Sequence, residues 1–168
     1  MNLGAGRDVL VWSPPFDIEM HWLDANGHLN MAFYNVMFDR TVDLALDALG
    51  CGHAYRATHN ASVFNVETHV VYRREVLGND KVRVSFQLLG RDAQRLHGYQ
   101  QMVRLGDDEL VASAESLFVH VDLLGRHAAA LPAAVADAAD AMVAAHRSAG
   151  EPRFAGRRIA PLAPLPPA

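Results

Sequence analysis

The sequence predicts an α+β protein in which a curved antiparallel sheet wraps around one long helix, with an extra helix at the C-terminus. Three observations predict this fold class. Apolar residues recur at helical spacing from about residue 30 to 50, four later segments alternate apolar and polar residues, and short turns join those segments. One helix after the first strand and a meander of strands afterwards is typical of this class.

The first strand is predicted over residues 16–20, where apolar and polar residues alternate. Pro14 and Pro15 come directly before it, and proline has no N–H to donate to a neighbouring strand. We therefore expect no regular strand pairing earlier in the chain, and we interpret residues 1–11 as a loose leader.

The long helix is predicted to begin after Asn30, a favoured N-cap residue, and to end at Gly50 and Gly52. Its apolar residues form a stripe wide enough to cover a sheet. The members of this stripe are Tyr34, Phe38, Val42, Ala45 and Leu49.

Four strands are predicted to follow, joined by turns that are rich in glycine, asparagine and aspartate. They cover residues 62–72, 81–88, 95–105 and 110–121. The last of them is apolar on both faces, which predicts an interior position in the sheet.

The C-terminal helix is predicted to open at Pro132, to run to about Ala149 and to stop at Gly150. We interpret residues 1–150 as one domain, because 168 residues suffice for a single core. Residues 151–168 hold five of the eight prolines and are expected to form a loosely ordered Pro-rich tail.

Composition restricts the classes of partner and compartment. The net charge of −4 gives no electrostatic case for binding nucleic acid, and no apolar stretch is long enough to span a membrane. Cys51 is the single cysteine, so the chain forms no internal disulfide, which fits a reducing compartment. The sequence therefore predicts a cytoplasmic protein.

The segment HWLDANGHLN, residues 21–30, places Asp24, Asn26, His28 and Asn30 at alternate positions before the long helix. The plain interpretation is a capped Asn-Gly turn, in which the aspartate and the last asparagine serve as capping groups. A metal site formed by His21, Asp24 and His28 is a second interpretation. It is disfavoured because no second cluster has ligand spacing, and we expect no metal.

With the strand–helix–meander order around it, this segment resembles the hotdog-fold thioesterases over residues 17–122. Asp24 stands three residues before Gly27, as in the 4-hydroxybenzoyl-CoA-thioesterase-like group. Plant acyl-ACP thioesterases carry D-x-N-x-H-x-N, which Asp24, Asn26, His28 and Asn30 match position for position. The segments 66–69, 94–97 and 118–122 are similar to the betainyl-CoA thioesterase domains of carnitine degradation.

The resemblance implies hydrolysis of an acyl-CoA thioester without a cofactor, with a short polar or cationic acyl group such as betainyl. Asp24 would attack the carbonyl or deprotonate a water, and these two alternatives stay open. The backbone N–H of Met31 would be the oxyanion donor. Asn26 would position the water or the carbonyl, and His28 would act as base or orient the aspartate.

Substrate-binding residues are expected around this motif and on the strand that follows. They are Gly27, Asn30, Tyr34, Glu67 and His69. Tyr34, with Trp22, Phe33 and Tyr72, offers aromatic faces for a trimethylammonium group. Arg73, Arg91 and Arg95 are candidates for the CoA end.

A homodimer or dimer of dimers is expected, because one sheet around one helix leaves a long unpaired edge. In such a dimer Glu67 would approach the helix entrance of the other subunit. Two other functions remain as alternatives, a hotdog-fold acyl-CoA hydratase or dehydratase and a non-catalytic acyl-binding dimer. An acyl-CoA panel with a thiol reagent distinguishes the three.

Overall fold

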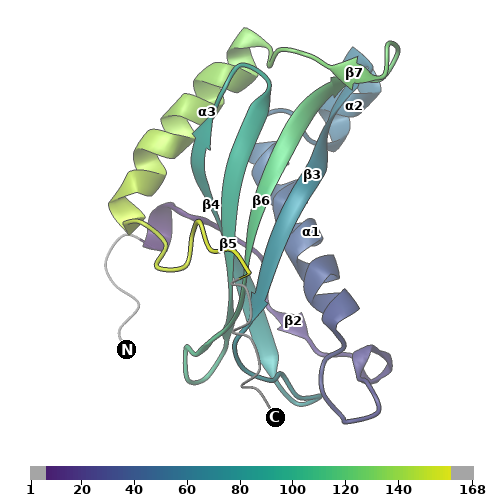
Figure 1. Ribbon diagram of the computed structural model, residues 1–168, viewed down its shortest axis with the longest axis vertical. Helices are drawn as coiled ribbons and strands as arrows, with labels where there is room; N and C mark the ends of the chain where they lie inside the picture. Colours follow the sequence, from purple (N-terminus) through teal and green to yellow (C-terminus); the bar gives the residue numbers. More distant parts are fainter. Residues whose placement is uncertain (1–6, 160–168) are drawn as a thin grey trace, which may run out of the picture.

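The computed structural model describes residues 7–159, which form a sheet with helices on one face and along one edge (Figure 1). The sheet order is β1-β4-β5-β6-β3, and two short strands extend it where β2 pairs with β4 and β7 with β6. The strands are β1 (Val11–Trp12), β2 (Phe16–Asp17), β3 (Ala61–Tyr72), β4 (Lys81–Arg91), β5 (Arg95–Arg104), β6 (Leu110–Asp122) and β7 (His127–Ala128). The helices are α1 (Met31–Ala48), α2 (His53–His59) and α3 (Ala133–His146).

The predicted long helix and the meander are confirmed. Asn30 caps α1, since its side-chain oxygen accepts a hydrogen bond from the Ala32 N–H at 3.0 Å. Every pairing among the long strands is antiparallel, and β6 lies between β5 and β3 as its apolar faces predicted. No helix in residues 7–159 is long and apolar enough to cross a membrane.

The N-terminal prediction needs correction. The strand expected over residues 16–20 has two residues, and a 3-10 helix replaces its end at Met20–Trp22. Strand pairing also begins before the prolines, because β1 pairs with β4 and Ser13 then bonds to both backbone groups of Val84, at 2.9 and 3.0 Å. The hydroxyl of Ser13 accepts the bond that a strand would otherwise make. Residues 1–6 of the expected leader lie outside the described residues.

One helix of the described residues, α2, was not predicted. The helix α2 has seven residues and ends at Asn60, whose φ of +47° is left-handed. It is tied to β6 by the Tyr55 hydroxyl, which donates to Nε2 of the buried His120 at 2.9 Å. Such a short helix gives too little sequence for a helical period to be recognised.

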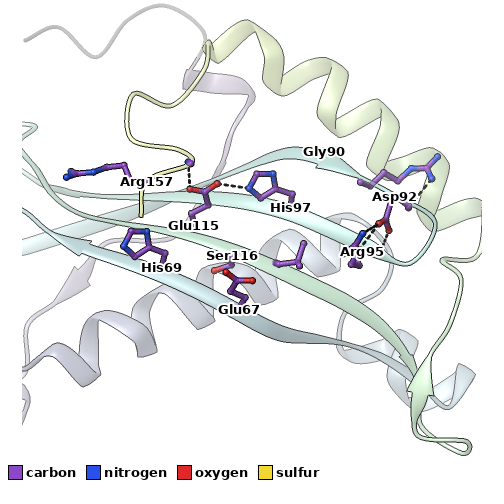
Figure 2. A pocket seen from close by; sticks show the side chains of 12 residues that line it. Glu67, His69, Gly90, Asp92, Arg95, His97, Glu115, Ser116 and Arg157 are labelled. Atoms are coloured by element: carbon purple, nitrogen blue, oxygen red, sulfur yellow. Dashed lines mark hydrogen bonds and ion pairs between the residues drawn. The ribbon is translucent and has the colours of Figure 1, made fainter. Parts of the chain in front are cut away.

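The segment after α3 crosses the face of the sheet that is opposite to α1 (Figure 2). The Gly156 N–H donates to the carboxylate of Glu115 at 2.6 Å. The Arg73 guanidinium lies over the Phe154 ring, 3.8 Å from its centroid. Residues 151–159 of the expected loose tail therefore contact the sheet, and residues 160–168 lie outside the described residues.

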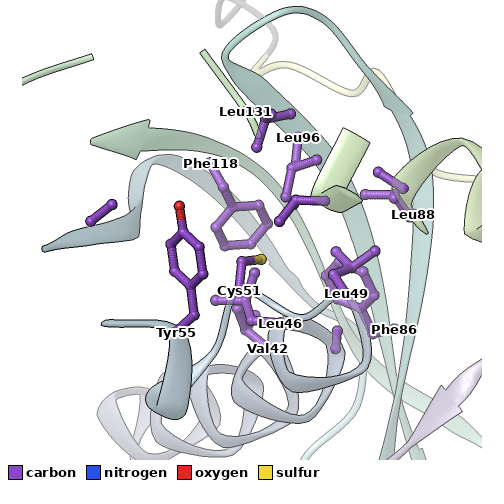
Figure 3. Packing of buried hydrophobic residues seen from close by; sticks show 14 residues of the cluster. Val42, Leu46, Leu49, Cys51, Tyr55, Phe86, Leu88, Leu96, Phe118 and Leu131 are labelled. Atoms are coloured by element: carbon purple, nitrogen blue, oxygen red, sulfur yellow. The ribbon is translucent and has the colours of Figure 1, made fainter. Parts of the chain in front are cut away.

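The core consists of two clusters, which hold the two halves of α1, and Figure 3 shows the cluster around the C-terminal half. The C-terminal half packs on Phe86 and Phe118 of the sheet and on Val135 of α3. The N-terminal half packs through Tyr34 and Met37 on the other ends of the strands. Each buried side chain of this size contributes about 1.5–3 kcal/mol. The start of α1 is therefore fixed against the sheet.

Candidate active site

The turn before α1 fixes the carboxylate of Asp24. One of its oxygens, Oδ1, accepts from the Asn26 N–H at 2.8 Å and from the His28 N–H at 3.1 Å. The backbone of Asp24 bonds in turn to His28 O at 2.8 Å and to the Gly27 N–H at 3.0 Å. Gly27 has a φ of +75°, which favours glycine. These contacts include the capping that the plain interpretation predicted.

The same contacts set the charge of Asp24. Hydrogen bonds from two backbone N–H groups, to which the Asn26 side chain adds, lower the pKa of its carboxyl below the usual value. The group is therefore an anion throughout the neutral pH range. It can attack a carbonyl directly or orient a water, but a low pKa makes it a weaker base.

The first turn of α1 presents one N–H without a protein partner. The N–H groups of Leu29 and Asn30 donate to Val76 O and Trp22 O. Those of Ala32 and Phe33 donate to the side-chain and backbone oxygens of Asn30. Within residues 7–159, the Met31 N–H makes no such bond. It lies at the positive end of the helix dipole, where an oxyanion is stabilised.

Asp24, His28, Asn30, Met31 and Tyr34 line one cleft of about 540 Å³. Its opposite wall consists of the last residue of β3, Tyr72, and the segment that follows it as far as Glu75. The rings of Tyr34 and Tyr72 meet edge to face with centroids 5.1 Å apart. Burial raises the pKa of Tyr34 to about 12, so this phenol stays neutral. Five of the predicted site residues are thus brought together.

Asn26 and Gly27 lie at the exposed tip of the turn and do not line the cleft. Their backbone N–H groups donate hydrogen bonds to Asp24 and so help to fix its position. His21 packs edge to face on Trp22 and Phe33. Trp22 is 4% exposed and stacks on Phe33 with centroids 5.2 Å apart, so these rings belong to the core rather than to the cleft.

Glu75 is a cleft residue that sequence reasoning missed, as it missed the neighbouring Arg74. Its carboxylate lies 3.0 Å from Nε2 of His28, although the two residues are far apart in the chain. Nothing local distinguishes Glu75 from an ordinary surface acid. The prediction would have required knowing that the β3–β4 connection returns beside the turn, as the Leu29 N–H bond to Val76 O shows.

The structure places Glu67 and His69 away from this cleft, in a cavity of about 580 Å³ on the opposite face of the sheet. There the Glu115 carboxylate is bonded to Nε2 of His97 at 2.8 Å (Figure 2). One protomer therefore does not bring Glu67 or His69 to Asp24.

A bulge in β3 helps to explain which of its side chains face α1 and which face the opposite side of the sheet. Strict alternation would put Asn65 on the same face as Glu67 and His69. The pairing with β6 shifts between Asn65 and Glu67, so that Asn65 faces α1 with Thr68, to which it bonds at 2.7 Å. Asn65 therefore does not share a face with Glu67 and His69, because the extra residue reverses the alternation.

A family model described as the thioesterase-like superfamily matches residues 18–139. A betainyl-CoA thioesterase from Pseudomonas aeruginosa is 34% identical over 146 residues, which are 87% of this chain and 89% of the relative. A solved putative thioesterase from Pseudomonas putida has a TM-score of 0.79 and 30% identity, covering 92% of this chain and 98% of its own. A Staphylococcus aureus protein in complex with CoA has a TM-score of 0.84 at 21% identity, covering 91% and 96%.

Proposed function

Because the chain belongs to the thioesterase-like superfamily and has a hotdog fold and the chemistry of a thioester hydrolase, we propose that it hydrolyses a short, cationic acyl-CoA at the Asp24 cleft. One observation carries the proposal. An ionised carboxylate and the unbonded N–H of Met31 line the same cleft. The relative named as a betainyl-CoA thioesterase and the structural neighbour in complex with CoA support this choice of substrate.

In this proposal the thioester carbonyl oxygen accepts a hydrogen bond from the Met31 N–H. Asp24, or a water held by it, adds to the carbonyl carbon, and the tetrahedral intermediate then expels CoA as a thiolate. A thiol of pKa about 8.5 leaves without an obligatory proton donor. If Asp24 itself attacks, water hydrolyses the resulting anhydride and restores the carboxylate. Either route yields one acid and one free CoA.

The size of a betainyl group limits where its charge can lie. Its nitrogen is two bonds from the reacting carbonyl carbon, so the trimethylammonium must occupy the same cleft as Asp24. Tyr34 and Tyr72 supply aromatic faces there, and Asp24 supplies negative charge. Each aromatic contact with such a cation is worth about 0.5–2 kcal/mol.

The arginines near the cleft suit the phosphates of CoA. Arg73 and Arg74 line the cleft itself. Arg91 is paired with Asp140, and Arg95 lies 2.6 Å from Asp92. Neither Arg91 nor Arg95 lines the Asp24 cleft, so we assign the CoA end to Arg73 and Arg74.

The free edge of the sheet supports a homodimer. On its outer side β3 pairs with no strand among the described residues, and Phe64 and Val66 there are 47% and 56% exposed. Antiparallel pairing of β3 with a second copy about the bulge would bring the start of the partner's β3 beside Tyr72 and the cleft. A cytoplasmic location is consistent with the single, buried Cys51.

The test compares betainyl-CoA with its neutral isostere 3,3-dimethylbutanoyl-CoA and with a long-chain acyl-CoA, with free CoA detected by a thiol reagent. We expect betainyl-CoA to have the highest kcat/KM. Asp24→Asn should lower kcat by about 10²–10⁴-fold, because an amide can neither attack nor accept a proton at neutral pH. Asp137→Asn, on the exposed face of α3, is the control.

A tenfold preference for the long chain would contradict the cationic substrate. Retention of more than half of the rate in Asp24→Asn would contradict the assigned carboxylate. Turnover of an enoyl-CoA without release of CoA would instead identify a hydratase.

A further inference from the structure

The side chains of His28 and Glu75 meet in the Asp24 cleft. An oxygen of the Glu75 carboxylate lies 3.0 Å from Nε2 of His28, close enough for its negative charge to stabilise a proton on that nitrogen. A neutral histidine with its proton on Nε2 keeps a free lone pair on Nδ1. Nδ1 is then the nitrogen that can accept a proton.

The main chain holds both partners in place. His28 forms a β-bridge with Leu77, and the next residue, Leu29, donates to Val76 O at 2.8 Å. Val76, which separates Glu75 from Leu77, is fully buried. The two side chains are 43% and 58% exposed, but their backbones are fixed, which reduces the entropy lost when they pair.

We propose that Glu75 is a positioning residue of the thioesterase, which holds His28 with its proton on Nε2 so that Nδ1 accepts the proton of the attacking water. The inference rests on the proposed function. The water oxygen forms a bond to the carbonyl carbon, or to that of an Asp24 anhydride, while its proton passes to Nδ1. The C–S bond, or the anhydride C–O bond, then breaks, and the proton moves to the departing group or to solvent.

These roles suit the chemistry of Asp24 as the anion and of His28 as the proton acceptor. The backbone hydrogen bonds that lower the pKa of Asp24 make it a reliable anion but a weak base. An imidazole is the better proton acceptor at neutral pH. The arrangement follows the logic of a nucleophile, a base and an acid that orients the base.

The charges around His28 predict the direction of a pH effect. Asp24 and Glu75 favour the protonated ring, whereas Arg73 and Arg74 in the same cleft disfavour it. Removing the charge of Glu75 therefore takes away part of the stabilisation of the protonated ring. Because the neutral ring is the active form, the acidic limb of the pH–kcat/KM profile moves to lower pH in Glu75→Gln.

The experiment uses three variants of the full chain with the best acyl-CoA substrate. Glu75→Ala should lower kcat about 10- to 100-fold with little change in KM, less than the 10²–10⁴-fold that a general base supplies. Glu75→Asp should recover part of the loss. Glu109→Gln is the matched control, because this acid pairs with Arg74 at 3.5 Å but does not line the cleft.

A double-mutant cycle separates positioning from folding. In a His28→Gln background, Glu75→Ala should have no further effect on kcat, since the residue acts through the histidine. An equal loss in both backgrounds, or an unchanged kcat and pH profile in the single variants, would overturn the inference while leaving the proposed function intact. A wild-type chain that hydrolyses no acyl-CoA would overturn both.

Discussion

Gly27 and Gly50 offer a matched pair for testing how tightly the Asp24 turn controls activity. Both have a φ of +75°, and at both an added Cβ would meet nothing within 4 Å. Alanine at either position therefore pays the cost of a left-handed conformation, about 1–2 kcal/mol, and no steric clash. The two glycines differ in their surroundings. Gly50 follows the end of α1, whereas Gly27 belongs to the turn that holds the Asp24 carboxylate.

The magnitude follows from the bonds of the turn. Asp24 is held by two bonds to Oδ1 and two through its backbone. Each contributes about 0.5–1.5 kcal/mol, similar to the strain that alanine adds. The turn can therefore relieve the strain by giving up one or two bonds. A displacement of about 1 Å in a reacting group can cost 10²-fold in rate.

We expect Gly27→Ala to lower kcat at least tenfold and Gly50→Ala to leave it within twofold. Melting temperatures should fall by no more than about 2–8 °C in either variant, which calorimetry will measure. Steady-state hydrolysis of the best acyl-CoA gives the rates. Equal rates in the two variants would refute the view that the turn geometry, rather than overall stability, positions Asp24.

Two further predictions concern assembly and stability. Val66→Lys places a charge at the centre of the free β3 edge, where a second copy would pair. Light scattering at micromolar concentration should therefore show a monomer for this variant and a dimer or tetramer for the wild type. A wild-type monomer would contradict the pairing of two copies through β3. Burial lowers the pKa of His146, whose Nδ1 accepts from the Leu88 N–H at 2.9 Å, so the folded state favours the neutral ring. This stabilisation is present above the unfolded pKa of about 6.5 and is lost as pH falls below it, by at most about 1.4 kcal/mol per pH unit. His146→Asn should flatten the fall in melting temperature between pH 7.5 and 5, and an unchanged slope would remove His146 as its cause.

Local chemistry in the sequence determined the parts of the protein that one segment can specify alone. The Asn30 cap, the apolar period of α1 and the turn residues between the strands each act over a few residues, so the α+β architecture followed from them. The Asp24 turn is equally local, since its bonds join residues 24–28. The resemblance to the hotdog-fold thioesterases indicated the Met31 N–H, which the structure leaves without a protein partner among the described residues.

The tertiary structure alone decided which distant residues meet and which face each strand presents. Alternation separates the two faces of β3 but does not say which one covers α1, and the bulge beside Val66 reverses the alternation partway. Glu67 and His69 were thereby placed opposite to the cleft. Glu75 reached His28 because the β3–β4 connection hydrogen-bonds to the residue after His28, a contact between segments that no local pattern encodes.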